Sequence, residues 1–83
     1  MNKLYICSDL NFAIGSESIQ YKWAIFTLDS AIKHSMYSVY DGIYYQIDII
    51  ETDIIETDIS YRFCRIVSRI TKKQLIKLSN ILY

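Results

Sequence analysis

The chain has 83 residues, which fits a single domain, residues 1–83, near the lower size limit for a hydrophobic core without disulfides or metal. With 52% hydrophobic and 22% charged residues, its composition is that of a globular protein and not of a disordered chain. The formal net charge is zero, and the apolar runs are too short for a secretory signal or a transmembrane helix. We therefore expect a cytoplasmic protein with no membrane partner.

Residues with metal-binding or catalytic chemistry are few. Cys7 and Cys64 lie far apart and His34 is the single histidine, so the chain has neither zinc-ligand spacing nor a redox CxxC motif. Two glycines are too few for a glycine-rich phosphate loop. We expect no enzyme activity, no cofactor and no metal site, and we interpret the cysteines as small buried hydrophobes and His34 as a surface or half-buried residue.

Residue usage also indicates a source. Isoleucine is abundant, and the chain has 8 tyrosines but only 2 glycines and no proline. Ile, Tyr, Asn and Lys are encoded by AT-rich codons, which favours a low-GC genome. Because small single-domain proteins of this kind are common in phages and mobile elements, we predict such an origin.

The first third of the chain predicts a strand, a loop and a second strand. Residues 3–8 are rich in strand-forming side chains. Residues 11–22 predict a loop, because they contain Gly15 and two serines. Residues 23–27 predict the second strand from their aromatic and β-branched side chains.

A helix of about ten residues is predicted from residue 28 onward. Its apolar or small side chains recur at helical spacing and are Leu28, Ala31, Ile32, Met36 and Val39. Thr27 or Asp29 can cap the first turn, and the pair Asp41 and Gly42 supplies a turn at the end.

Residues 43–49 alternate in the way a half-buried strand does. The side chains expected to face the core are Ile43, Tyr45, Ile47 and Ile49. Those expected to face solvent are Tyr44, Gln46 and Asp48. A second strand is predicted from residue 59, with inward side chains at Ile59, Tyr61 and Phe63 and an outward Arg62.

Residues 49–59 contain the five-letter unit IIETD twice. A period of five keeps no constant face on a strand or a helix, so the repeat favours a hairpin in which the second copy returns beside the first. Pairing Ile49 with Ile59 would place Asp48 diagonal to Arg62 and would leave the connection at residues 52–56. A dedicated binding motif is the alternative interpretation.

The last element has the clearest signal. Thr71 and Gln74 have the spacing of a capping box, and Leu75, Leu78 and Leu82 then follow on one side of an amphipathic helix. The complete order is strand, strand, helix, strand, strand, helix. It predicts the α+β class, with an antiparallel sheet of about four strands and two helices on one face.

Charge is segregated along the chain. Residues 1–59 hold all 9 acids and only three lysines, whereas residues 60–83 hold six bases and no acid. Five of the acids fall between residues 48 and 58, near the predicted hairpin tip. The partner-binding residues that this pattern predicts are Asp48, Glu51, Asp53, Glu56 and Asp58, with an exposed Tyr44 as aromatic anchor.

We interpret the chain as a small interaction protein that binds and inhibits a host protein with a basic surface, in the manner of a host-takeover or anti-defence protein. A solvated turn without a partner is the plainer interpretation of the same acids. One alternative function is nucleic-acid binding through the basic segment, using Arg62, Arg65, Arg69, Lys72, Lys73 and Lys77. Another is self-association as a homodimer, through an unprotected hairpin edge and the tyrosine-rich strand.

Three segments resemble small ADP-ribosyltransferase-like domains of bacteria and phages. They are residues 23–31, with a Phe-Thr step from strand into helix, residues 42–48, with the sequence GIYYQID, and residues 64–71, with the sequence CRIVSRIT. The resemblance covers about half of the chain. The arginine or histidine that holds NAD near the first strand of that family has no counterpart, and neither does its late glutamate, since residues 60–83 contain no acid. What the resemblance implies is a scaffold reused for binding.

Overall fold

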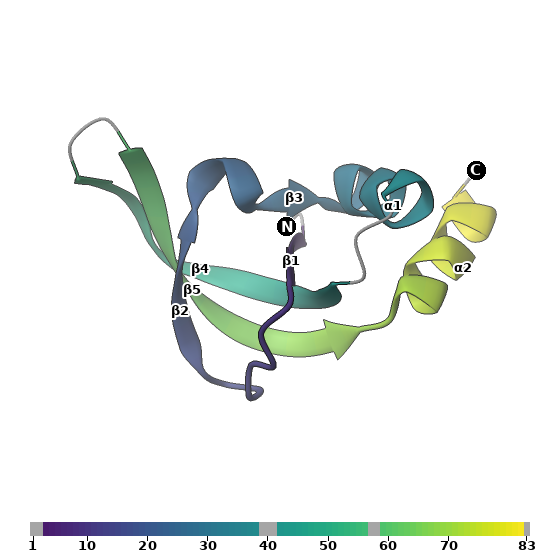
Figure 1. Cartoon of the computed structure of the whole chain (residues 1–83), viewed down its shortest axis with the longest axis horizontal. Helices are drawn as coiled ribbons and strands as arrows, with labels where there is room; N and C mark the ends of the chain where they lie inside the picture. The colour runs from purple at the N-terminus through teal and green to yellow at the C-terminus, as the bar shows by residue number, and fades with distance from the viewer. Residues whose placement is uncertain (1–2, 39–41, 57–58, 83) are drawn as a thin grey trace.

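The fold is an antiparallel sheet with two helices, seen in a computed structural model (Figure 1). The structure describes residues 3–38, 42–56 and 59–82, and the side chains of residues 3–38, 42–51 and 60–78. The elements are β1 (Leu4–Ser8), β2 (Glu17–Tyr21), the short 3-10 helix η1 (Lys22–Ala24), β3 (Phe26–Thr27), α1 (Leu28–Tyr37), β4 (Ile43–Glu56), β5 (Ile59–Ile70) and α2 (Lys72–Leu82).

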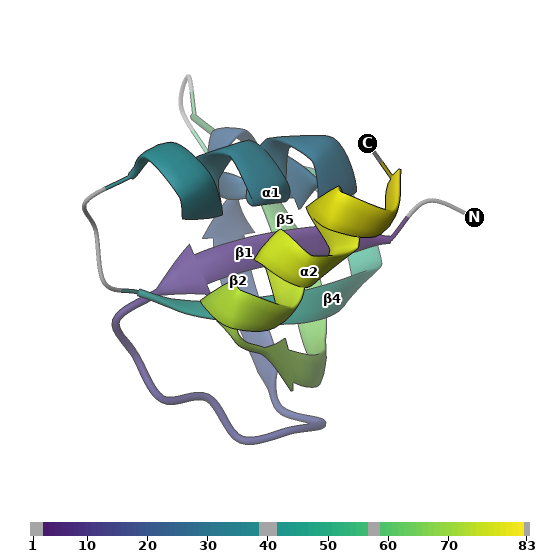
Figure 2. The same ribbon diagram turned by 90° about the vertical axis from the view of Figure 1, so that its right-hand side faces the viewer.

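The sheet has five strands in the order β2-β5-β4-β1-β3, and all neighbours are antiparallel. The two helices lie next to each other on one side of the sheet (Figure 2). Ala31 and Ile32 of α1 and Leu75 of α2 belong to one buried cluster, which places both helices on the same face. The predicted α+β class with two helices on one face is therefore confirmed. The sheet has one strand more than the four or so that were predicted.

The additional strand is β2, in a segment that was predicted to be a loop. Gly15 has a φ of +87°, which suits glycine, and the strand begins two residues later at Glu17. β2 pairs with β5 from Glu17 opposite Arg65 to Tyr21 opposite Tyr61. The loop prediction is wrong because β2 is an edge strand whose exposed side chains are partly apolar, so it lacks the inward apolar alternation used to recognise strands.

The predicted strand at residues 23–27 is also mostly wrong, because only Phe26 and Thr27 are extended and pair with β1. The helix that follows is confirmed. The Thr27 hydroxyl accepts a hydrogen bond from the Ser30 N–H and caps α1, which ends at Tyr37. Met36, predicted on the apolar side, is 49% exposed.

The β4–β5 hairpin exists, but its predicted register is wrong. Ile49 lies opposite Cys64 instead of Ile59, and Asp48 lies opposite Arg65 instead of diagonal to Arg62. Because β4 continues to Glu56, the segment 52–56 belongs to the strand and not to the connection. The register shifts between Gln46 and Ile47, between Ile49 and Glu51, and between Glu51 and Ile54, which the regular ladder used for the prediction did not include.

The sheet buries side chains on both of its faces. On the helix face, Tyr5 and Tyr44 pack with Ala31, Ile32 and Leu75. The opposite face, called the loop face here, carries a second cluster. Its buried members are Ile6, Tyr45, Ile47, Cys64 and Ile66, and the partly buried Phe12 and Ile25 of the connecting segments pack against them.

Two-sided burial explains why Tyr44 and Tyr45, adjacent along β4, are both inside. Successive side chains on a strand point to opposite faces, so one ring enters each cluster. The Tyr45 hydroxyl donates to the Leu10 carbonyl at 3.0 Å and accepts from the Phe12 N–H at 2.9 Å. These two bonds hold the β1–β2 loop against the loop face.

The capping box at the start of α2 is confirmed. The Gln74 N–H donates to the Thr71 hydroxyl at 3.1 Å, and the Thr71 N–H donates to Gln74 Oε1 at 2.8 Å. Leu75 is fully buried and Leu78 packs against the same cluster, while the side chain of Leu82 lies outside the described residues.

Replacing Tyr45 with phenylalanine should lower the free energy of unfolding by about 1–3 kcal/mol, because it leaves the Leu10 carbonyl and the Phe12 N–H without their buried partner. Urea denaturation followed by circular dichroism measures the change. Tyr37→Phe is the control, because Tyr37 is 79% exposed and its substitution should have little effect. Equal stability of the Tyr45→Phe variant and the wild type would contradict this assignment.

Candidate functional site

The predicted acidic site divides into residues that the structure places and residues that it does not. Asp48 and Glu51 are exposed on β4, opposite Arg65 and Phe63 of β5. Asp53 and Glu56 lie in β4, but their side chains are outside the described residues, as is all of Asp58.

Tyr44 does not belong to the surface, and its prediction as an exposed anchor is wrong. Its side chain is 1% exposed and packs under the helices. The hydroxyl forms hydrogen bonds with His34 Nδ1 and with the Cys7 thiol. The alternation along residues 43–49 was interpreted as one buried and one solvated face, whereas α1 and α2 cover the second face at this position.

Beyond the helices, the helix face of the sheet carries a row of charged residues. Asp48, Arg65 and Glu17 lie side by side on β4, β5 and β2, because residues directly opposite each other share a face. Arg65 Nη2 is 3.4 Å from Glu17 Oε1, and these side chains are 52% and 44% exposed. The row therefore holds two carboxylates and one guanidinium at the surface.

An exposed aromatic group lies further along the same strands. Trp23 is 77% exposed, and its ring stacks on Tyr21 with centroids 5.3 Å apart and planes at 19°. Tyr21 is 43% exposed, and its ring also contacts that of Tyr61, with the ring centroids 5.1 Å apart. Tyr21 is thus held between two other rings.

Two apolar residues connect this stack to the charged row. Phe63 lies between Ile19 on β2 and Glu51 on β4, and Ile19 is 59% exposed. We define the aromatic patch as Ile19, Tyr21, Trp23, Tyr61 and Phe63. Three carboxylates border it, namely those of Glu17, Asp48 and Glu51.

The patch could not be recognised without knowing the partner of β2. Ile19, Tyr21 and Trp23 are close in sequence, but Tyr61 and Phe63 join them only through the β2–β5 register. One signal was available: in the segment 17–21, Ile19 and Tyr21 alternate with polar residues, which is the pattern of an exposed strand.

The arginines of the predicted nucleic-acid site are divided between the two faces of β5. Arg65 is on the helix face beside Glu17, whereas Arg62 and Cys64 share the loop face. The Arg62 Nε is buried without a hydrogen-bond partner among the described residues. Arg69 lies opposite Tyr45, again on the loop face, and its Nη1 donates to Asn11 Oδ1 at 3.4 Å.

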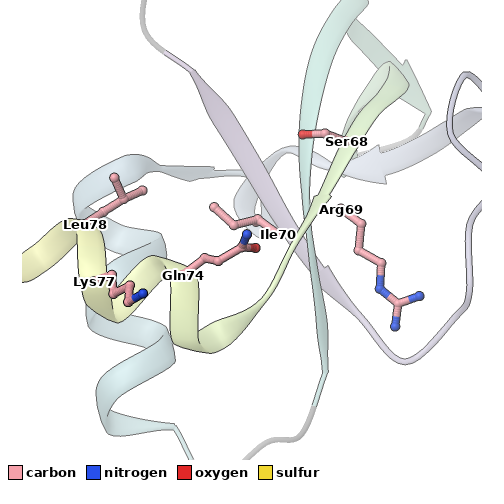
Figure 3. Close-up of a pocket in the computed structure, with 6 residues that line it drawn as sticks. All are labelled: Ser68, Arg69, Ile70, Gln74, Lys77 and Leu78. Carbon is pink, nitrogen blue, oxygen red and sulfur yellow. The ribbon is translucent and has the colours of Figure 1, made fainter.

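The lysines of that site are on α2. The Nζ of Lys72 donates to the Ser38 carbonyl at 3.3 Å, while Lys73 and Lys77 are exposed. A groove of about 470 Å³ separates this helix from the end of β5 (Figure 3). Its lining residues are Ser68, Arg69, Ile70, Gln74, Lys77 and Leu78.

Figure 3 shows that the Arg69 guanidinium points away from Gln74 and Lys77, on the other side of the strand. The groove thus has Ile70 and Leu78 as apolar lining, but its two cations do not converge on a common point. The basic segment of the sequence therefore does not fold into one continuous basic face.

Cys7, Tyr44 and His34 form a small polar cluster between the sheet and α1. Burial raises the pKa of the Tyr44 hydroxyl well above its ordinary value, and the neighbouring Cys7 raises it further. Burial also raises the pKa of the Cys7 thiol, against the opposing effects of the Tyr44 hydrogen bond and the Lys72 charge. Cys7 and Tyr44 are therefore neutral at physiological pH, and the cluster is suited to packing.

Within the described part of the chain, no group of three or more His, Cys, Asp or Glu residues is placed so that it could hold a metal ion. The same residues include no helix that is long and apolar enough to cross a membrane.

Comparison with family models, with curated proteins and with solved structures found no match to this chain. The resemblance to ADP-ribosyltransferase-like domains thus stays a prediction from the sequence segments alone. In the structure, its first segment, residues 23–31, spans part of η1, the short β3 and the start of α1.

If the aromatic patch is a binding surface and not part of the core, its outermost residue should contribute little to folding. Trp23→Ser is expected to change the free energy of unfolding by no more than about 0.5 kcal/mol, because the side chain is mostly in solvent. Ile66→Ala, at a fully buried position, is the contrasting variant and should cost about 2–5 kcal/mol. Urea titration of both variants checks this, and a large loss from Trp23→Ser would show a structural role instead.

The polar cluster predicts a loss of stability in alkali. An unfolded tyrosine ionises near pH 10, whereas folded Tyr44, with its raised pKa, keeps its proton. Above that pH the unfolded chain binds fewer protons than the folded chain, so the free energy of unfolding falls as pH rises. The raised pKa values of Cys7 and Cys64 act in the same direction. Urea titrations between pH 8 and pH 11 should show a shallower decline for Tyr44→Phe than for the wild type, and equal slopes would contradict the assignment.

Proposed function

We propose that the chain is a non-enzymatic interaction protein whose aromatic patch binds a protein partner with a basic surface. The observation that supports this most is the exposure of Ile19, Tyr21 and Trp23 side by side on one face. Contiguous exposed apolar surface is uncommon on proteins that have no partner, and such patches often mark interaction sites.

The composition of the patch suits a protein interface. Tryptophan and tyrosine are enriched among residues that dominate binding energy, because they bury a large area and lose few rotamers. Tyr21 is already held between Trp23 and Tyr61, so less conformational entropy is lost when a partner covers it. The patch is therefore largely ordered before binding.

The charged border favours a basic partner. Glu17 is engaged by Arg65, which leaves Asp48 and Glu51 as the carboxylates that a partner's lysines and arginines would meet. Rim charges of this kind speed association and select the partner more than they add affinity. They also disfavour nucleic acid at this patch, because carboxylates repel phosphates although the rings themselves could stack on bases.

This proposal keeps the basic protein partner predicted from the sequence and moves its site from the hairpin tip to the helix face of β2, β5 and β4. A host protein bound there would have its own basic surface covered, so that its other ligands could not reach that surface. Inhibition of the host protein would arise in this way. Inhibition itself, and the phage or mobile-element origin, stay predictions.

Affinity capture with matched variants tests the proposal. The bait is the whole chain, incubated with lysate of a candidate host treated with nuclease. A protein captured by the wild type should be lost with Tyr21→Ser combined with Trp23→Ser, and reduced at least about tenfold with Asp48→Lys combined with Glu51→Lys. Capture should also weaken as salt is raised from 50 to about 300 mM.

Lys73→Glu combined with Lys77→Glu is the charge-reversal control, because these exposed lysines lie on α2, away from the patch. This variant should retain the partner. If instead it loses binding while the patch variants keep it, or if binding depends on nucleic acid in the lysate, the alternative nucleic-acid function replaces the proposal.

A further inference from the structure

β2 is an edge strand with one unpaired side. It is the terminal strand of the sheet, and its ladder is with β5 alone in the part of the chain that the structure describes. Edge strands expose a row of backbone N–H and C=O groups, and proteins usually protect such rows with charges, proline or bulges. β2 instead presents Ile19 and Tyr21, both exposed.

The hydrogen bonds at the start of β2 show which of its backbone groups are unpaired. The Ile66 N–H donates to the Ser16 carbonyl and the Ile66 carbonyl accepts from the Gly15 N–H, both at 2.8 Å, so a bulge at Gly15 and Ser16 lies opposite Ile66, and the Ser16 carbonyl faces β5. In an antiparallel ladder every second residue of a strand faces the same neighbour, so the backbone of Ser18 and Gln20 also faces β5. The N–H and C=O groups of Glu17 and Ile19 and the N–H of Tyr21 therefore point to the open side, whereas the Tyr21 carbonyl, at the N-cap of η1, accepts the first bond of that helix.

We propose that a second copy of this chain pairs with that edge, β2 against β2 and antiparallel, about a two-fold axis at Ile19. The three residues with outward backbone groups are spaced evenly around Ile19. In a symmetric pair Ile19 lies opposite Ile19 of the second copy, and Glu17 lies opposite Tyr21. The Ile19 N–H and C=O groups of the two copies then pair with each other, the Tyr21 N–H of one copy pairs with the Glu17 carbonyl of the other, and the two sheets become continuous.

The side chains fit this arrangement. The antiparallel pairing keeps Glu17 of one copy away from Glu17 of the other and places it next to Tyr21 at the end of β2. The two Glu17 carboxylates are therefore kept apart, and two exposed isoleucines meet at the centre.

A dimer of this form would place two aromatic patches on one continuous face. The inference does not depend on the proposed partner, because it concerns the backbone edge of β2 and the oligomeric state of the protein alone. If both hold, one dimer presents two equivalent binding surfaces, and avidity would favour partners with repeated basic segments.

Sedimentation velocity over a concentration series tests the proposal. The wild type should shift with concentration from the mass of one chain to twice that mass. Ile19→Lys and Ile19→Glu should each raise the dimer dissociation constant by at least about tenfold, because like charges would face each other across the axis. An equimolar mixture of the two variants should associate again, since the opposite charges then meet.

A backbone variant separates the edge from its side chains. Ile19→Pro removes only an N–H that points outward, and proline is tolerated on the free side of an edge strand, so β2 should stay paired with β5 while dimerisation is lost. Ile19→Thr keeps the N–H and is the control that should still dimerise. Circular dichroism shows whether the Ile19→Pro variant is folded. If it is unfolded, the equimolar mixture of Ile19→Lys and Ile19→Glu decides whether the β2 edge forms the dimer. A wild type that stays monomeric up to millimolar concentration, or charge variants that dimerise as well alone as mixed, would overturn the proposal.

Discussion

Pairing of β2 with the middle of β5 is the constraint on which the other features depend. It makes β5 an interior strand, with β4 on one side and β2 on the other, so that Cys64 and Ile66 are fully buried. It also requires the chain to cross from one edge of the sheet to the opposite edge between β2 and β3. The crossing segment supplies Ile25 to the cluster on the loop face.

The same pairing creates the candidate site. Without β2, Phe63 and Tyr61 would be isolated side chains on a long hairpin. With it, they join Ile19, Tyr21 and Trp23 in one patch, and Glu17 engages the arginine that lies between it and Asp48. The surface that results is apolar at its centre and acidic at its border, which is suited to binding a basic protein.

Local signals in the sequence were sufficient for parts of the fold. The Thr71 and Gln74 capping box, the Thr27 cap and the helix from Leu28 depend on residues a few positions apart, and the structure contains all three. The prediction that Tyr44 is exposed failed for a different reason. Alternation shows that neighbouring residues on a strand face opposite ways, but it does not show whether a helix covers the second face.

The non-local features could not be predicted in the same way. The isoleucine-rich repeat offers several hairpin registers with similar apolar pairs, and the observed one depends on irregular pairing around Ile49 and Glu51. The apolar residues of β2 alternate on its exposed side and not toward the core, so both the strand and the aromatic patch depend on a contact with residues 40 or more positions away.

Backbone hydrogen exchange in dilute protein tests the central pairing most directly. The account predicts slow exchange for the Ser18 and Gln20 amides, which face β5, and fast exchange for those of Ile19 and Tyr21, which face the open edge. Fast exchange at all four positions, at the rate of an unstructured chain, would contradict the β2–β5 pairing and with it the aromatic patch.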